Sequence, residues 1–365
     1  MAVSGYRNVL VTGGAGFVGS NLALSLKRRE PDAHITAADN LRRRGSETNV
    51  SRLREAGIDF LHCDIRNRED LRLDSQKDER PIDLLIECSA EPSVLAGYGE
   101  APDYVINTNL IGTINCLDLA RRSGADLIFL STSRVYPIAA LNRIATEEAE
   151  SRFLLAPDQT LAGASEHGIS EAFPLEGARS LYGATKLCSE LLIQEYGAMY
   201  GVRFVINRCG VITGPWQMGK VDQGVFALWM AHHYFSRELS YIGWGGHGKQ
   251  VRDLLHVDDL AELIAAQLER FETLAGSTFN VGGGNACSLS LLETTSLCRE
   301  ITGHTVPIHR VAETRPADLK LYITDTRGVT EATGWAPRHD PRDTLTAIYD
   351  WIREAEPVVR HLWSD

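Results

Sequence analysis

A tyrosine and a lysine four residues apart carry the clearest acid–base chemistry in the sequence. Tyr182 and Lys186 open a stretch that predicts a helix running to about Tyr200. Because residues four apart share one face of a helix, the ammonium can lie beside the phenol and lower its pKa, as a general base requires. This spacing also arises by chance, so an exposed helix pair without a role is the alternative.

A glycine-rich turn near the N-terminus is typical of a phosphate-binding site. Residues 9–11 predict a buried strand, and residues 21–26 begin a helical pattern. Gly13, Gly16 and Gly19 lie between them. Their spacing allows a tight turn, a close approach of the backbone to a pyrophosphate, and close packing of the helix on the strand. A glycine turn that binds nothing is the alternative.

An acid follows at the end of the second predicted strand. Residues 35–38 predict this strand, and Asp39 comes twenty residues after Gly19. At that position a carboxylate would hold the ribose hydroxyls of an adenosine and would repel a 2′-phosphate. The motif therefore predicts NAD in preference to NADP, although the arginines at 42–44 leave NADP open.

Strands and helices alternate along the first half of the chain. Apolar runs at 59–63, 83–88, 125–130 and 202–208 predict strands, and residues 107–122 predict a strong helix. The alternation predicts an α/β fold, a doubly wound parallel sheet of the Rossmann type, whose ligands bind where the strands end. The residues at these strand ends are Asp64 and Ile65, expected beside an adenine, then Ser89, Ala90 and Glu91, and finally Thr132, Ser133 and Arg134.

The composition changes after residue 213. Residues 214–250 are rich in tryptophan and glycine and alternate little, which predicts the start of a smaller C-terminal α/β substrate domain. We expect an NAD-binding domain over 1–213, with 251–285 returning to it. The smaller domain would then consist mainly of 214–250 and 286–365. Basic side chains between turns just before and at Arg252 suit a second phosphate group.

The segment 138–180 is long and polar and contains no clear core strand. A loop of this length in a compact domain is usually functional or disordered. We expect it to form a lid or a wall of the substrate pocket, and a solvated insertion is the alternative.

Composition argues against several classes of function. The formal net charge of −11 disfavours broad nucleic-acid binding. No apolar run reaches the length of a membrane span, and the first residues show no signal-peptide pattern. The seven cysteines include no Cys-x-x-Cys pair and are expected as reduced core thiols of a cytoplasmic protein. No histidine or cysteine cluster has metal-ligand spacing, so we predict no metal.

Together these pieces resemble the extended short-chain dehydrogenase/reductases, the group of nucleotide-sugar epimerases and dehydratases. The matching pieces cover nearly the whole chain and are residues 12–19, Asp39, Asp64-Ile65, Asn109, Thr132 with Val135-Tyr136, Tyr182 with Lys186, and residues 252–259. Within this group the chain looks most like the CDP-tyvelose (CDP-paratose) 2-epimerases, through residues 131–136, 222–224, 248–253, 280–283 and 288–293.

The resemblance implies a nucleotide-sugar epimerase with tightly bound NAD. Such an enzyme oxidises its sugar transiently to a keto-sugar and returns the hydride to the opposite face, here at C2 of a CDP-linked sugar. Tyr182 would take the proton of the sugar hydroxyl, and Thr132 would hydrogen-bond the same oxygen. Lys186 would tune the tyrosine and hold the nicotinamide ribose. The helix after Asn107 and the helix carrying Tyr182 imply a homodimer or tetramer.

Two sets of contact residues follow from the motifs and the resemblance. The cofactor-binding set for NAD is Gly13, Gly16, Phe17, Val18, Gly19, Asp39, Asn40, Asp64, Ile65, Ser89, Ala90, Asn109, Tyr182 and Lys186. The substrate-binding set is Glu91, Ser93, Ser133, Arg134, Arg208, Gln223 and Arg252. The expected partner is a nucleoside-diphosphate sugar, with CDP favoured.

Two departures from the family patterns narrow the choice of reaction. In the 4,6-dehydratases Asp-Glu follows the catalytic threonine, whereas Ser133-Arg134 stand here, which disfavours dehydration. Many 4-epimerases of the UDP-galactose type carry asparagine where this chain has Val211. The open alternatives are an NAD-dependent 4-epimerase, another nucleoside-diphosphate-sugar dehydrogenase or decarboxylase, and a non-catalytic NAD-binding sensor.

Overall fold

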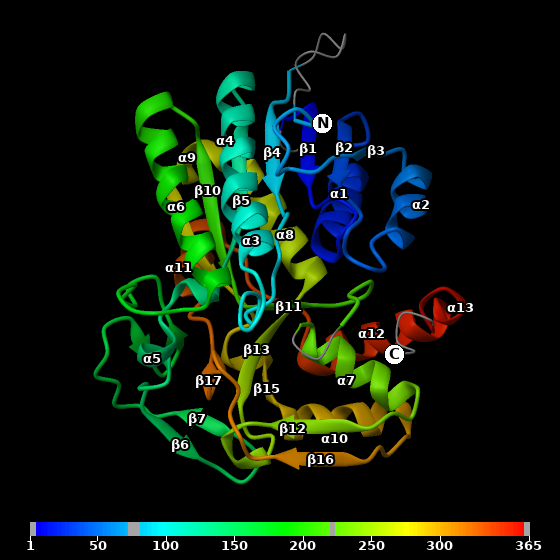
Figure 1. The fold of residues 1–365 in the computed structure, drawn as a ribbon, viewed down its shortest axis with the longest axis vertical. Helices are drawn as coiled ribbons and strands as arrows, with labels where there is room; N and C mark the ends of the chain where they lie inside the picture. Colours follow the sequence, from blue (N-terminus) through cyan, green and yellow to red (C-terminus); the bar gives the residue numbers. More distant parts are fainter. Residues whose placement is uncertain (1–4, 72–80, 220–222, 361–365) are drawn as a thin grey trace.

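Seven parallel strands form the sheet in the upper half of the molecule in Figure 1. The computed structural model describes residues 5–71, 81–219 and 223–360. The strand order is β14-β10-β5-β4-β1-β2-β3, and every neighbouring pair is parallel. The strands are β1 (Asn8–Thr12), β2 (His34–Asp39), β3 (Asp59–His62), β4 (Leu84–Glu87), β5 (Asp126–Thr132), β10 (Phe204–Cys209) and β14 (Ser277–Val281). Because the order turns back between β1 and β4, a crevice opens where these strands end.

Helices cover both faces of this sheet. On one face α1 (Phe17–Arg29) packs against α8 (Val257–Glu269), and on the other α4 (Gly112–Ser123) packs against α6 (Leu181–Tyr200). The helices α2 (Thr48–Glu55), α9 (Phe271–Leu274) and α11 (Arg327–Thr333) complete this half. The predicted doubly wound sheet is thereby confirmed.

The helix predicted over 107–122 is less regular than expected. It is a run of α3 (Asp103–Ile106), one π-helical turn over Asn107–Ile111, and α4. The side chain of Asn109, inside the π turn, bonds to both backbone groups of Glu91. Single π turns of this kind occur frequently at functional sites, and this one clamps the segment that follows β4.

The lower half of the molecule has its own small sheets and core. β13 (Val251–His256) lies between β11 (Val211–Thr213) and β15 (Ser288–Ser290) and also pairs with β17 (Leu321–Tyr322). β12 (Leu239–Ile242) pairs with β16 (Ile308–Val311). The helices are α7 (Val225–Tyr234), α10 (Leu291–Thr302), α12 (Pro341–Glu354) and α13 (Glu356–Val359). Their apolar faces share one buried cluster, as the smaller α/β domain requires. The domain boundaries drawn from the sequence stay a prediction.

The segment 138–180 folds into short elements on the lower left of Figure 1. They are α5 (Ile138–Leu141), the hairpin of β6 (Thr146–Glu148) with β7 (Phe153–Leu155), and the hairpin of β8 (Ala164–Ser165) with β9 (Gly168–Ile169). Ile169 and Phe173 are buried in one cluster with Leu319 and Tyr322 of the lower half. The segment is therefore an ordered part of the packing rather than a solvated insertion.

Candidate active site

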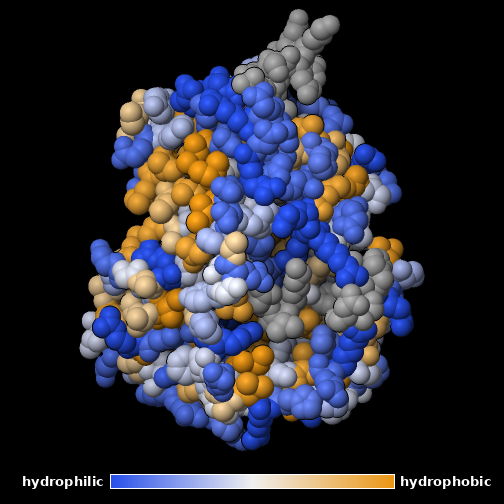
Figure 2. All heavy atoms as spheres, in the orientation of Figure 1, coloured by the Kyte–Doolittle hydropathy of each residue, from blue (hydrophilic) through white to orange (hydrophobic). Residues whose placement is uncertain are grey.

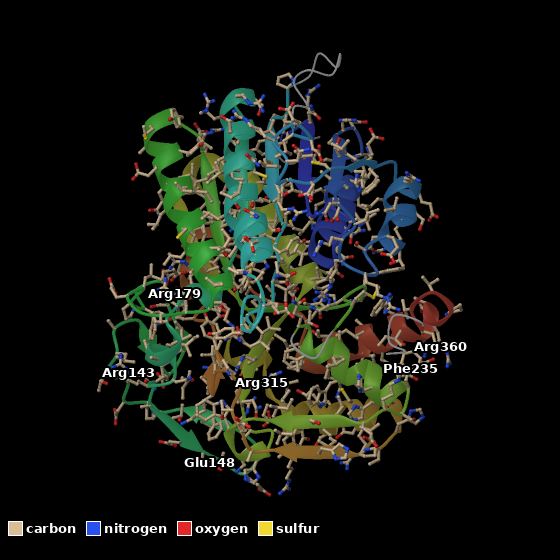
Figure 3. All side chains as sticks on the ribbon, viewed as in Figure 1. Arg143, Glu148, Arg179, Phe235, Arg315 and Arg360 are labelled. Carbon is tan, nitrogen blue, oxygen red and sulfur yellow. The ribbon has the colours of Figure 1, made fainter. Side chains whose placement is uncertain are left out.

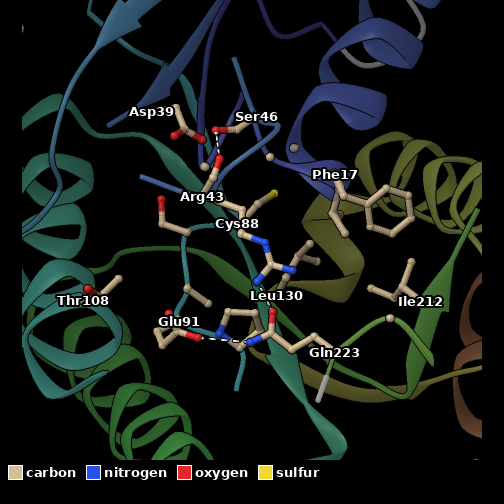
Figure 4. Close-up of a pocket in the computed structure, with 18 of the residues that line it drawn as sticks. Phe17, Asp39, Arg43, Ser46, Cys88, Glu91, Thr108, Leu130, Ile212 and Gln223 are labelled. Atoms are coloured by element: carbon tan, nitrogen blue, oxygen red, sulfur yellow. Dashed lines mark hydrogen bonds between the residues drawn. The ribbon is translucent and has the colours of Figure 1, made fainter. Parts of the chain in front are cut away.

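A cavity of about 670 Å³ lies where strands β1, β2, β4 and β5 end. Figure 4 shows part of its lining. Of the predicted cofactor contacts, those that line it are Gly13, Gly16, Phe17, Val18, Gly19, Asp39, Asn40, Asp64, Ile65, Ser89, Ala90 and Tyr182. Thr132, Ser133 and Glu91 line it as well. The structure thus gathers the glycine motif, the acid after β2 and the predicted base in one place.

The glycine turn has no room for side chains. A Cβ on Gly13 would lie 2.9 Å from the carbonyl carbon of Cys88, and Gly13 has a φ of 64°. A Cβ on Gly19 would lie 2.2 Å from the carbonyl oxygen of Gly13. The cap of α1 at Gly16 has no side-chain hydrogen bond, so the backbone N–H groups of the first turn remain available to an anion. This cradle fits the pyrophosphate of NAD.

Two carboxylates stand on the adenosine side of the cavity. Asp39 accepts hydrogen bonds from the backbone N–H groups of Leu41, at 2.8 Å, and Ala15, at 3.2 Å. Burial raises the pKa of Asp39, and these backbone donors oppose the shift. For Asp64, a side-chain hydrogen bond from Arg66 is the main cause that lowers its pKa to about 2. Both positions suit the predicted roles beside the ribose and the adenine.

The predicted base sits in the first turn of α6. Ser180 caps this helix by accepting from the backbone N–H of Gly183, which aims the first turn at the end of β5. Burial raises the pKa of Tyr182 to about 12, and a side-chain hydrogen bond with Thr132 opposes the shift. The groups that oppose the effect of burial on this pKa are Thr132 and Arg134, so the tuning role expected of Lys186 stays a prediction.

Lys186 lies behind the cavity rather than on its wall. Its side chain is 1% exposed, and Nζ stands 3.8 Å from the ring centroid of Phe129. Burial lowers the pKa of this ammonium, and the charge of Glu87 is the main opposing cause. Its role in holding the nicotinamide ribose stays a prediction.

Four predicted contact residues line neither cavity described in this section: Asn109, Lys186, Ser93 and Arg208. Arg208 forms a buried ion pair with Glu190 at 2.7 Å, which holds its guanidinium beneath the site. Asn109 is fully buried, and its side-chain amide accepts from the backbone N–H of Glu91 and donates to the carbonyl of Glu91. The hydroxyl of Ser93 accepts from the backbone N–H of Leu95. The contact roles expected for these residues stay predictions.

A second cavity of about 380 Å³ adjoins the first. Both cavities are lined by Val94, Arg134, Val211, Gln223 and Gly224. Arg252 lines the second, where its Nη2 donates to Asp318 Oδ1 at 3.3 Å and to the carbonyl of Leu319 at 2.7 Å. Apolar side chains, among them Trp229 and Leu289, form much of the remaining wall. None of residues 138–180 lines either cavity, and the expectation of a lid or pocket wall stays a prediction.

An arginine bridge crosses the first cavity, and no motif in the sequence indicated its role. Arg43 donates to the side chain of Gln223 and, at 2.9 Å, to the carbonyl of Met218. Gln223 in turn donates to Glu91 at 3.2 Å, as Figure 4 shows. The bridge ties the loop after β2 to the segment before α7. The arginines at 42–44 were the available signal, but they were weighed only for their bearing on NADP.

A histidine pair invites comparison with a metal site. Among the described residues, His256, Asp258 and His339 have potential ligand atoms within 4.8 Å of one another. However, the two imidazoles stack, with centroids 4.1 Å apart and planes 21° apart. In nearly parallel stacked rings the nitrogen lone pairs point in parallel planes, so they do not converge on one ion. The arrangement therefore gives no metal assignment.

Comparison with known proteins places this site in a family. A model of the NAD dependent epimerase/dehydratase family matches residues 9–282. The chain belongs to this family. The resemblance drawn from the sequence is thereby confirmed, and NAD is the cofactor, as the cradle and Asp39 require. No helix within the described ranges is long and apolar enough to span a membrane.

Relatives within the NAD-dependent epimerase/dehydratase family catalyse different reactions. The CDP-paratose 2-epimerase of Salmonella typhi is 28% identical over 356 residues, which cover 94% of this chain and 98% of that protein. The dTDP-glucose 4,6-dehydratase of Streptomyces griseus is 30% identical, over 96% of this chain and 97% of that protein. A solved structure, the UDP-glucose 4-epimerase of Thermus thermophilus in complex with NAD, has a TM-score of 0.75 at 26% identity, with 96% and 100% covered. Family membership therefore leaves the reaction to be argued from the site.

Proposed function

We propose that this protein is a nucleotide-sugar epimerase that inverts C2 of a CDP-linked sugar through transient oxidation. One observation carries the proposal: the Thr132–Tyr182 pair lines the same cavity as the NAD motif, and a second cavity that holds arginines adjoins this one at Arg134. A nucleoside-diphosphate sugar has the matching parts, an anionic diphosphate between a nucleoside and a sugar. The likeness to the CDP-paratose 2-epimerase of Salmonella typhi supports the choice of CDP and of C2.

Each residue has a distinct task in this reaction. Thr132 hydrogen-bonds the sugar hydroxyl and Tyr182 takes its proton, since the two side chains already meet. Lys186 stands one helical turn away and keeps a positive charge close to the phenol. Bound NAD supplies a hydride acceptor that also returns the hydride, so that no net oxidation results. Arg134 and Arg252 hold the diphosphate and keep the keto-sugar from leaving.

Two buried acceptors support a polar ligand in the second cavity. Asp318 Oδ2 and Gln250 Oε1 have no hydrogen-bond partner, and both residues line this cavity. The Gln250 amide is fixed, because its Nε2 donates to the carbonyl of Ile242 at 2.8 Å. Since a buried acceptor without a partner costs free energy, donors on a bound nucleoside would stabilise both groups.

The test is incubation of the purified protein with CDP-, UDP-, GDP- and dTDP-sugars, followed by NMR of the products and by absorbance of NADH. We expect a new C2 diastereomer from a CDP-sugar and no net NADH. Inversion at C4 would make the protein a 4-epimerase. Steady NADH formation, or loss of carbon dioxide, would make it a dehydrogenase or decarboxylase. Retained NAD with no turnover of any substrate would favour the sensor.

The proposal includes a homodimer in the cytoplasm. Leu191 and Met199 of α6 are 55% and 67% exposed, and Ile111 of the π turn is 39% exposed. Figure 2 shows hydrophobic residues gathered at the upper left, over α4 and α6. The seven cysteines are free thiols, as in a reducing compartment. Sedimentation should show a dimer or tetramer, and a profile of monomer alone would contradict the assembly.

A further inference from the structure

Arg134 occupies the boundary between the two cavities. Among the described residues that line both cavities, Arg134 is the one with a charged side chain. Its backbone N–H donates to Thr132 Oγ1 at 3.2 Å, in the short 3-10 turn Ser133–Val135 that follows β5. Its guanidinium donates to the carbonyl of Ala317 at 3.0 Å, which turns it toward the second cavity. A cation is thus held two residues from the threonine that contacts Tyr182.

Polar groups continue from Arg134 into the second cavity. Gln250 lies just before β13 and Arg252 is the second residue of this strand, and both line the cavity. Asp318, which accepts from Arg252, is their neighbour. Burial lowers the pKa of Arg134 to about 10, and repulsion from Arg252, which lines the same cavity, adds to this shift. Arg315 also lines this cavity, and Figure 3 places it in the lower half of the molecule.

We propose that Arg134 binds the phosphate attached directly to the sugar and thereby presents C2, rather than C4, to Thr132 and Tyr182. This inference rests on the proposed function and specifies which residue sets the reacting carbon. Arg134 is a positioning and specificity-determining residue in this assignment, because it contacts the phosphate and not the reacting atoms.

The connectivity of the sugar gives the reason. The phosphate is bonded through oxygen to C1, and C2 is the next ring atom, whereas C4 lies across the ring. Arg134 lies two residues from Thr132 and lines both cavities, so a phosphate on its guanidinium would keep the C1 end of the ring near the base. A site for C4 would need the phosphate held a full ring width from Thr132, and Arg252, which lines the second cavity but not the first, is the cation for that. The charge at residue 134 is what favours C2.

The first test compares binding of CMP and CDP to the holoenzyme by calorimetry. CDP carries the second phosphate and CMP lacks it. Arg134→Gln should weaken CDP binding roughly 10- to 100-fold, because a charge-assisted contact is lost, and should change CMP binding less than about threefold. Arg134→Lys should fall between wild type and Arg134→Gln, and serves as the test if the glutamine variant does not fold.

The matched control is Arg143→Gln, since Arg143 lies at the outer edge of the molecule in Figure 3. It should leave both affinities unchanged. Equal losses of CMP and CDP binding in Arg134→Gln would overturn the proposal, and so would unchanged CDP binding. The comparison of CMP and CDP binding can be interpreted whether or not the protein epimerises any sugar.

The second test is a crystal structure of the Tyr182→Phe holoenzyme with CDP-glucose. We expect the C2 oxygen nearest Thr132 Oγ1 and the sugar-linked phosphate on the Arg134 guanidinium. The C4 oxygen in that place, or a phosphate held by Arg252 alone, would overturn the assignment of C2. Failure of the proposed function would show separately, as absence of turnover in the wild-type enzyme.

Discussion

The two cavities are built in different ways, although both are lined by Arg134 and Gln223. The cofactor cavity is made by consecutive strand ends and by a backbone turn that excludes side chains at Gly13 and Gly19. The second cavity collects single residues from segments as distant as Arg134, Trp229 and Asp318. A local motif is thus enough to bind NAD, whereas recognition of the substrate depends on how two halves of the chain pack. Substrate specificity can therefore change without disturbing the cofactor.

Tyr182→Phe should have the largest effect, and should spare both cavities. Removal of the hydroxyl takes away the base, so turnover should fall roughly 100- to 10,000-fold. NAD content and CDP binding should stay close to wild type, because the ring remains. Retained turnover would show that another group removes the proton.

Gly19→Ala should damage the cofactor cavity alone. The added Cβ would collide with the carbonyl of Gly13, and such overpacking typically costs about 1–3 kcal/mol. We expect the purified variant to have lost most of its NAD, measured by absorbance after denaturation. Gly328→Ala is the control, because the nearest atom to its Cβ would lie 3.4 Å away. Equal NAD content in both variants would contradict this account of the turn.

Asn142→Ala should damage the second cavity alone. Its side chain donates to the carbonyl of Asp318 and accepts from the backbone N–H of Lys320, both at 3.1 Å, and so holds the loop that lines this cavity. Loss of both bonds should raise KM roughly 10-fold with little change in kcat or NAD content. Gln159→Ala is the control, since the bonds of Gln159 stay within the segment 138–180. An unchanged KM would remove the supporting role given to this segment.

Asp64→Asn should have the smallest effect, on stability and with a defined pH dependence. Arg66 lowers the pKa of Asp64 from 3.8 to about 2 in the folded protein. The carboxylate therefore stabilises the fold above pH 3.8, and this contribution disappears as the pH falls toward 2. After allowance for partial exposure, the variant should lose about 1 kcal/mol at pH 7 and less at pH 3, measured by urea unfolding. An equal loss at both pH values would exclude the charge as the cause.

The cofactor side of the site could be predicted because its signals are local. Gly13, Gly19 and Asp39 have fixed spacings that arise from one strand-turn-helix unit. The strands and most helices could also be predicted, because apolar periodicity is a local signal as well. The π turn around Asn109 could not be foreseen, because it depends on a hydrogen-bond partner in the segment after β4.

The substrate side required knowledge of packing. Arg208 has the residue type of a phosphate ligand, but α6 places Glu190 against it, and that contact has no sequence signature. Asp318 and Gln250 lie in stretches without a motif, and only the fold brings them to one cavity. The raised pKa of Tyr182 likewise follows from burial, which the helical spacing of Tyr182 and Lys186 does not reveal.

The most direct test of the account is a turnover experiment in ordinary water, with no added NAD and a CDP-sugar deuterated at C2, mixed with the same sugar labelled with carbon-13 and not deuterated. The account predicts C2-inverted product in which each deuterium remains in the molecule that brought it. Loss of deuterium from C2 to solvent would indicate enolisation, and a requirement for added NAD in every turnover would indicate a dehydrogenase. Either result would contradict transient oxidation within one closed site.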